Sequence, residues 1–132
     1  MNFVEAVKSY FINWIDFKSR SSRSEFWWAW IFLLVFQNLN QVIVDYILGI
    51  VFSQNAILIV TVISISVMQI FICIATASII VRRLHDVNKS GWWYLIVFTV
   101  IGVIPIIFWF CSKGTDGGNR FGNDPLDITT NV

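Results

Sequence analysis

Charged residues are scarce in this sequence, and two long stretches almost or wholly lack them. Only 13% of the 132 residues are charged and 57% are hydrophobic, whereas a soluble domain has roughly 25% charged residues. The 56 residues from Phe26 to Val81 contain one charge, Asp45, and the 21 residues from Trp92 to Ser112 contain none. This separation excludes a water-soluble core, a disulfide scaffold and a disordered chain.

Side chains that could carry chemistry are also few. The two cysteines, Cys73 and Cys111, lie inside apolar runs, where a thiol usually packs as a small hydrophobe. The single histidine, His85, and the scattered carboxylates lack any metal-ligand spacing. A net charge of +1 is too small for a nucleic-acid-binding surface. We therefore expect no metal, no cofactor and no nucleic-acid partner.

Three apolar segments dominate the chain: residues 26–52, 56–81 and 92–111, which are 27, 26 and 20 residues long. A bilayer is crossed by about 20 helical residues, and lipid forces the backbone into helices because it offers no other hydrogen-bond partners. The sequence therefore predicts an all-α integral membrane protein. It forms one domain over residues 1–132 and ends in a polar tail at residues 112–132.

The third segment allows two layouts. Three full crossings are the simplest count, and they place the tail outside the cell. Gly102 and Pro105 interrupt this segment, so a kinked or re-entrant hairpin that returns the tail to the cytoplasm is the alternative.

A shorter amphipathic helix is predicted ahead of the first span, over residues 2–18. Asn2 followed by Glu5 is a capping pattern, and Ser22 with Glu25 repeats it just before Phe26. An aromatic stripe beside a span predicts a helix that lies in the membrane interface, with packing on a partner protein as the alternative. Apolar residues recur at steps of three and four: Phe3, Val7, Tyr10, Trp14 and Phe17.

Lysine and arginine are distributed unevenly around the first two segments. The connection at residues 53–55 contains none, and cytoplasmic loops carry the excess of basic residues. We therefore expect the N-terminus and the loop after the second segment to be cytoplasmic. The basic residues before the first segment are Lys8, Lys18, Arg20 and Arg23, and those after the second are Arg82, Arg83 and Lys89.

Basic and tryptophan side chains would meet at this cytoplasmic boundary. Tryptophan prefers the headgroup level, and each basic group near an anionic leaflet gains about 1 kcal/mol. We predict a platform that docks anionic lipid or a partner protein, with ordinary topological anchoring as the alternative. Its members are Arg20, Arg23, Arg82, Arg83 and Lys89 together with Trp27, Trp28, Trp92 and Trp93.

His85 and Asp86 are adjacent and invite a general-base hypothesis. Neighbours in sequence do not share a helix face, and no nucleophile is identifiable within reach. We expect Asp86 and Glu25 instead to neutralise the arginines, so an enzyme is the least favoured class and no catalytic residue is predicted.

Polar residues also occur inside the first two segments. Gln37, Gln41 and Asp45 follow at intervals of four on one helix face, and Gln69 lies in the middle of the second segment. Hydrogen bonds between helices are one explanation. The alternative is a polar path through an oligomeric transporter or channel, for which intramembrane ionisable groups are typical.

Three motifs carry a resemblance to a known family. They are FKSRSSRSEFW at residues 17–27, RRLHDVNKSGWW at 82–93 and GTDGGNRFGNDP at 114–125. With these motifs the sequence resembles the domain-of-unknown-function 805 (DUF805) family of small bacterial inner-membrane proteins. The resemblance implies a multi-pass protein of the bacterial inner (plasma) membrane without an agreed activity. It implies a shared site, and the tail would then lie on the cytoplasmic side.

The predicted function is a non-enzymatic module that docks a lipid headgroup or a partner protein, with membrane lipids as partners and a homo-oligomer or membrane-protein complex also considered. The alternative is a transporter or channel subunit that uses Gln37, Gln41, Asp45 and Gln69. The candidate docking residues are Arg20, Arg23, Glu25, Trp27, Arg82, Arg83, His85, Asp86, Lys89, Trp92, Asn119, Arg120 and Asp124.

Overall fold

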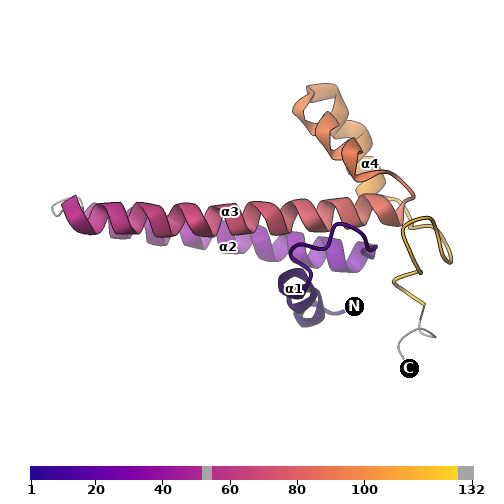
Figure 1. The fold of residues 1–132 in the computed structure, drawn as a ribbon, viewed down its shortest axis with the longest axis horizontal. Coiled ribbons are helices and arrows are strands. Elements are labelled where there is room, and N and C mark those ends of the chain that lie inside the picture. Colours follow the sequence, from indigo (N-terminus) through magenta and orange to yellow (C-terminus); the bar gives the residue numbers. More distant parts are fainter. Residues whose placement is uncertain (52–54, 128–132) are drawn as a thin grey trace.

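Two long helices, α2 (Arg23–Val51) and α3 (Asn55–Asp86), form the frame of the molecule and lie side by side (Figure 1). The computed structural model describes residues 1–51 and 55–127. At 1.5 Å per residue the helices are about 44 and 48 Å long. Two stretches, Arg23–Ile50 and Thr61–Asp86, are long and apolar enough to cross a membrane.

The helices α2 and α3 extend beyond the predicted segments, 26–52 and 56–81, mainly at the end of the pair where α2 begins and α3 ends. α2 begins at Arg23 and α3 continues to Asp86, so the RRLHD motif is the last part of a helix and not a loop. Residue 52, the connection at 53–54 and the end of the tail at 128–132 lie outside the described residues. Ser22 caps α2 by accepting a 3.3 Å hydrogen bond from the Glu25 amide.

The N-terminal helix, α1 (Phe3–Ile12), is shorter than the predicted range of residues 2–18. Its predicted cap is present, with Asn2 and Glu5 each accepting a 2.9 Å hydrogen bond from the other's backbone amide. The predicted end is wrong because Asp16 accepts hydrogen bonds from two following backbone amides, which favours a turn over a further helical turn. α1 runs across the long helices and is seen nearly end-on in Figure 1.

The packed core lies where α1 and the last segments meet one end of the α2–α3 pair. It includes Tyr10, Phe26, Ile79, Leu84 and Phe110. Most apolar side chains of the far halves of α2 and α3 are exposed. A lipid solvent can accommodate such a surface, whereas water could not.

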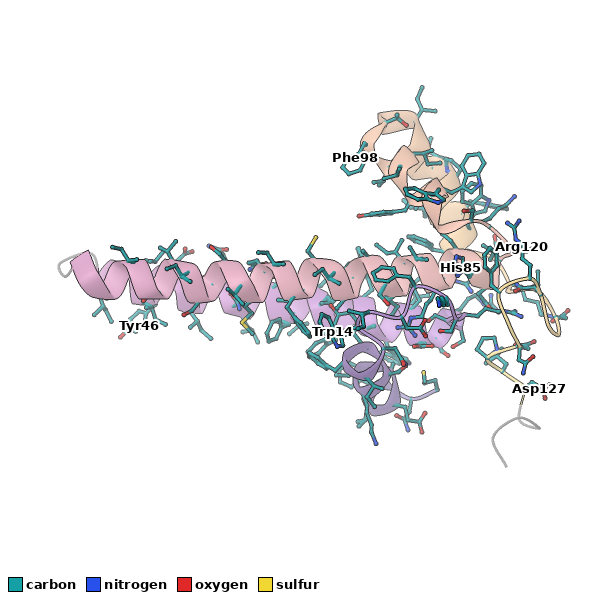
Figure 2. All side chains as sticks on the ribbon, viewed as in Figure 1. Trp14, Tyr46, His85, Phe98, Arg120 and Asp127 are labelled. Carbon is teal, nitrogen blue, oxygen red and sulfur yellow. The ribbon has the colours of Figure 1, made fainter. Side chains whose placement is uncertain are left out.

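The third apolar segment is a hairpin of short helices. It contains two 3₁₀ helices, η1 (Gly91–Phe98) and η2 (Val100–Gly102), followed by α4 (Val103–Cys111). The rings of Trp93 and Trp109, near its two ends, are 5.5 Å apart. The expected full crossing is therefore wrong, since it would separate these ends by about 25 Å. Phe98 lies at the far end of the hairpin (Figure 2).

The reversal depends on close backbone contact at Gly102. The Thr99 hydroxyl donates to the Ile96 carbonyl at 2.7 Å and accepts from the Gly102 amide at 3.1 Å. A Cβ added at Gly102 would lie 1.9 Å from the Ile96 carbonyl oxygen. Only glycine fits here, so the hairpin returns the tail to the end of the molecule where α2 begins.

We expect Gly102→Ala to destabilise the protein by about 1–3 kcal/mol, because the methyl group would force the η1–α4 hairpin apart. Gly49→Ala is the matched control, since nothing lies within 4 Å of a Cβ at that position. Thermal unfolding in detergent, followed by circular dichroism, should give a lower midpoint for Gly102→Ala only. Equal midpoints for the two variants would contradict this account of the reversal.

Candidate functional site

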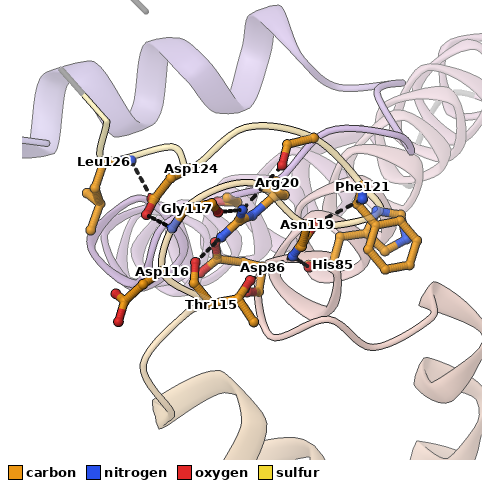
Figure 3. A network of polar contacts seen from close by, with 12 residues as sticks. Arg20, His85, Asp86, Thr115, Asp116, Gly117, Asn119, Phe121, Asp124 and Leu126 are labelled. Carbon is orange, nitrogen blue, oxygen red and sulfur yellow. Dashed lines mark hydrogen bonds and ion pairs between the residues drawn. The ribbon is translucent and has the colours of Figure 1, made fainter. Parts of the chain in front are cut away.

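A polar cluster lies where three segments distant in sequence meet: residues 13–25, the last residues of α3 and the tail from residue 112 (Figure 3). Five of its charged side chains are buried: Arg20, Glu25, Arg82, Arg83 and Asp86. The cluster unites the three motifs that carry the family resemblance.

Arg20 holds the tail in place. Its Nε and Nη2 donate to Asp86 Oδ1 at 3.1 and 2.9 Å. Nη2 also donates to the Thr115 carbonyl at 2.6 Å, and Nη1 donates to the carbonyls of Gly117 at 2.6 Å and Gly122 at 3.3 Å. A guanidinium has five N–H donors, so Arg20 has none left for an external ligand.

Asp86 is shared between two buried arginines. One carboxylate oxygen accepts from Arg20, and the other accepts from Arg83 Nη1. Arg83, whose side chain is fully buried, also donates to the carbonyls of Phe110 and Ser112, which end the hairpin. One carboxylate thus joins the segment before α2, the end of α3 and the returning chain.

A second ion pair fixes α1. Arg82 Nη1 lies 2.9 Å from Glu25 Oε1, which also accepts the Ser9 hydroxyl at 2.7 Å. The Nε and Nη2 atoms of Arg82 are buried with no partner among the described residues. Unpaired buried donors are costly, so Glu25 is the main counter-charge that keeps this arginine inside.

The turn after α1 is tied to α3. The Ser78 hydroxyl lies 2.9 Å from the Asn13 carbonyl and 2.7 Å from the Asp16 carbonyl. Burial raises the pKa of Asp16, but hydrogen bonds from Ser19 and Lys18, with the nearby Arg82 charge, bring that pKa below its ordinary value. The carboxylate is thus held in its ionised, turn-forming state.

The tail is ordered by its own turns and by its contact with α3. Asn119 Nδ2 donates to the His85 carbonyl at 2.9 Å and to the Thr115 hydroxyl at 2.7 Å. Asp124 accepts from the Gly117 amide at 3.1 Å. A Cβ at Gly114 would lie 2.2 Å from an Asp86 carboxylate oxygen, so glycine lets the tail pass directly over that carboxylate.

His85 and Asp86 do not act as a pair in this arrangement. The His85 ring stacks on Phe121, with ring centroids 3.8 Å apart, and its Nδ1 lies 3.3 Å from the Ser19 carbonyl oxygen. Asp86 is occupied by Arg20 and Arg83. Within residues 1–51 and 55–127, no three histidine, cysteine or acidic side chains come together to hold a metal.

The predicted platform is divided between the interior and the surface. Arg20, Arg82 and Arg83 are buried, so their charges belong to the fold. Arg23 is exposed, and its side chain makes no hydrogen bond or ion pair among the described residues. The other predicted members that reach the surface are Trp27, Trp28, Lys89, Trp92 and Trp93.

An open groove of about 380 Å³ lies between α3, the hairpin and the segment after α1. We call it the aromatic groove. Sequence reasoning placed Phe17 in the N-terminal helix and Tyr94 and Leu95 in the third apolar segment, and it missed their convergence because no local signal links the two segments. The groove is lined by Phe17, Val81, His85, Ser90, Gly91, Trp92, Tyr94 and Leu95.

Three basic residues adjoin the lining of the aromatic groove in sequence or through Phe121. Lys18 directly follows the lining residue Phe17, and Lys89 directly precedes the lining residue Ser90. The Arg120 guanidinium lies 4.6 Å from the ring centroid of Phe121, the ring that covers His85. We call Lys18, Lys89 and Arg120, which adjoin residues of the lining or the ring that covers His85, the cationic rim of the groove.

The predicted intramembrane polar face is also divided. Gln37 and Gln69 exchange hydrogen bonds at 3.4 Å between α2 and α3. Gln41 and Asp45 are exposed and joined to each other at 2.8 Å. One part of this face stabilises the helix pair, and the other part faces outward.

Comparison with known proteins identifies relatives along most of the chain. The family model described as a protein of unknown function (DUF805) matches residues 14–123. Inner membrane protein YhaI of Escherichia coli (strain K12) is 32% identical over 118 residues, which cover 86% of this chain and 88% of YhaI. Inner membrane protein YhaH of the same strain is 32% identical over 122 residues, with 86% and 89% covered. No solved structure matches.

We expect Arg20→Lys to release the tail, because an ammonium group cannot reproduce the five-donor fork that binds Asp86 and three carbonyls. Two lost charge-assisted bonds are worth about 3 kcal/mol or more. Tryptic cleavage at Lys113 and Arg120 should then accelerate by at least about 100-fold. Mass spectrometry of the fragments measures the rate.

Arg23→Lys is the control for that substitution, since Arg23 is exposed and holds no other group. Its tail should be cleaved at the wild-type rate. Equal rates for the two variants would show that Arg20 does not anchor the tail.

Proposed function

The chain belongs to the DUF805 family of proteins of unknown function, and from that premise we propose that it is a non-enzymatic inner-membrane module whose cytoplasmic surface docks anionic phospholipid. Two findings support the inner membrane as its location. The relatives YhaI and YhaH are both named inner membrane proteins, and α2 and α3 can each cross a bilayer.

The distribution of charge supports a cytoplasmic orientation for the polar cluster. All nine lysines and arginines lie in α1, the segment after it, the first residue of α2, the end of α3, the loop that follows and the tail. These segments gather at one end of the long helices (Figure 1). Such an excess at one end is typical of the cytoplasmic side. The hairpin then enters the membrane from that side and returns to it.

The aromatic groove with its cationic rim is the observation that carries the docking proposal. Its apolar walls accept an acyl chain, and aromatic rings such as Trp92 prefer the headgroup level. Lys18, Lys89 and Arg120 would face the lipid phosphate, with about 1 kcal/mol from each. This arrangement replaces the predicted platform, because its members Arg20, Arg82 and Arg83 are buried.

The buried arginines support docking indirectly. Arg20 and Arg83 fix the tail that carries Arg120 and Phe121, and Arg82 fixes the α1 segment that leads to Lys18. They are therefore positioning residues in this proposal. A transporter subunit has weaker support, because Gln37 and Gln69 use their amide groups to bond to each other between α2 and α3.

We expect the double variant Lys18→Gln, Arg120→Gln to weaken binding of phosphatidylglycerol about 30-fold, since two contacts of about 1 kcal/mol each are lost. Binding of zwitterionic phosphatidylcholine should change little. Native mass spectrometry of the detergent-solubilised protein, titrated with each lipid, gives the two dissociation constants.

The matched control is Lys8→Gln, Lys113→Gln, which removes two exposed cations that do not border the groove. It should retain nearly all of the affinity for phosphatidylglycerol. If both double variants lose the same affinity, a general charge effect explains the binding and the groove is not the site.

The hairpin layout also predicts where a C-terminal reporter lies. A fluorescent protein fused after residue 132 should fluoresce, and alkaline phosphatase at the same place should be inactive, because the tail is cytoplasmic. The same reporters inserted in the connection at residues 52–54 should give the opposite result. Active alkaline phosphatase at the C-terminus would contradict the proposed topology.

A further inference from the structure

Three polar side chains of α2 face away from the rest of the molecule, inside its apolar span. Asn38, Gln41 and Asp45 are exposed. Among the described residues, Asn38 Nδ2 donates to the Leu34 carbonyl of its own helix, at 2.6 Å, and to no other group. Gln41 likewise donates to Asp45 on the same helix. None of the three reaches α3.

The depth of Asn38 makes lipid a poor neighbour for it. At 1.5 Å per residue, Asn38 lies about 18 Å from Phe26 and therefore near the middle of the hydrocarbon layer. Its carboxamide oxygen accepts no hydrogen bond from any residue that the structure describes. Hydrocarbon cannot supply the missing donor. A partner helix at the same depth can.

The residues around Asn38 form a continuous seam with the spacing of a coiled coil. Ile31, Asn38 and Asp45 recur every seven residues, and a second series falls between them at steps of three and four. All but Leu48 are exposed. The seam extends over about 32 Å, which is close to the hydrocarbon thickness. Its members are Trp27, Ile31, Leu34, Asn38, Gln41, Asp45 and Leu48.

We propose that this α2 seam binds the α2 helix of a second copy of the chain, giving a parallel symmetric dimer in the membrane. Two copies inserted the same way have parallel α2 helices, and a two-fold axis places each seam residue opposite itself. A carboxamide has both donor and acceptor groups, so Asn38 complements its own copy. Asn38 occupies the a position of this heptad, with Ile31 before it and Asp45 after it. A single asparagine at an a position fixes the register of parallel helix pairs.

Asp45 weakens the same dimer that Asn38 stabilises. The two-fold axis places one Asp45 carboxylate opposite the other, about 28 Å from Phe26, near the far boundary of the hydrocarbon. The hydrogen bond from Gln41 offsets part of the repulsion. Asn38 therefore strengthens the dimer and Asp45 weakens it, a pair of opposed effects that simple loss of folding cannot produce.

The dimer does not depend on lipid docking. The seam lies on α2, whereas the aromatic groove is built from residues 17, 81, 85, 90–92, 94 and 95, so no residue belongs to both. Either proposal can fail alone.

The test is the dimer dissociation constant of the full chain in liposomes, measured by resonance energy transfer between labelled copies as lipid dilutes the protein. We expect Asn38→Leu to weaken dimerisation about 3- to 30-fold, the range for one hydrogen bond between membrane helices. Asp45→Asn should strengthen it. Asn40→Leu is the control, since Asn40 contacts Met68 of the same copy and not the seam, and its constant should equal the wild-type value.

Disulfide trapping gives a second readout. With Cys73 and Cys111 replaced by serine, Leu34→Cys should form a dimer on oxidation, whereas Tyr46→Cys, exposed on a different face, should not. A wild-type chain that stays monomeric in pure lipid would overturn the proposal and leave the seam to a different membrane protein. Equal effects of Asn38→Leu and Asn40→Leu would also overturn it.

Discussion

One carboxylate, that of Asp86, organises the polar end of the molecule. It lies between the buried guanidinium groups of Arg20 and Arg83. Charges removed from water are costly unless they are paired and hydrogen-bonded. The carbonyls of the tail and of the hairpin end complete that requirement. The segment before α2, the end of α3 and the returning chain must therefore come together. Their contacts fix the positions of the exposed side chains that these segments carry.

The sequence predicts the elements that a local cause determines. Lipid leaves a long apolar run no alternative to a helix, which is why α2 and α3 were recognisable, and Asn2 with Glu5 marks the start of α1. The hairpin was not predictable from composition, since a crossing and a reversal can contain the same residues. The contact between Gly102 and Ile96 decides between them. The ends of two helices were not predictable either. The turn at Asp16 is tied to Ser78, and the end of α3 at Asp86 is bonded to Thr115, both far along the chain.

The candidate site shows the same division. The three resembling motifs indicated which residues gather, and the structure brings Arg20, Asp86 and Asn119 together. The sequence could not indicate which cations are buried, because an arginine inside and an arginine at the surface look alike until their partners are known. Arg20, Arg82 and Arg83 are buried and serve the fold, whereas Lys18 and Arg120 are exposed. No local sequence pattern indicates the aromatic groove, because its lining comes from three segments that meet only in the folded chain.

The anchoring of the tail by Arg20 has a consequence for biogenesis. Arg20 emerges early from the ribosome, whereas the carbonyls of Thr115, Gly117 and Gly122 that complete its shell are translated about a hundred residues later. Until then its guanidinium group is only partly satisfied, even if α2 and α3 have already been inserted. The last step in the folding of this end must therefore follow synthesis of the tail, and in a chain that stops short of it Arg20 lacks three of its hydrogen-bond acceptors.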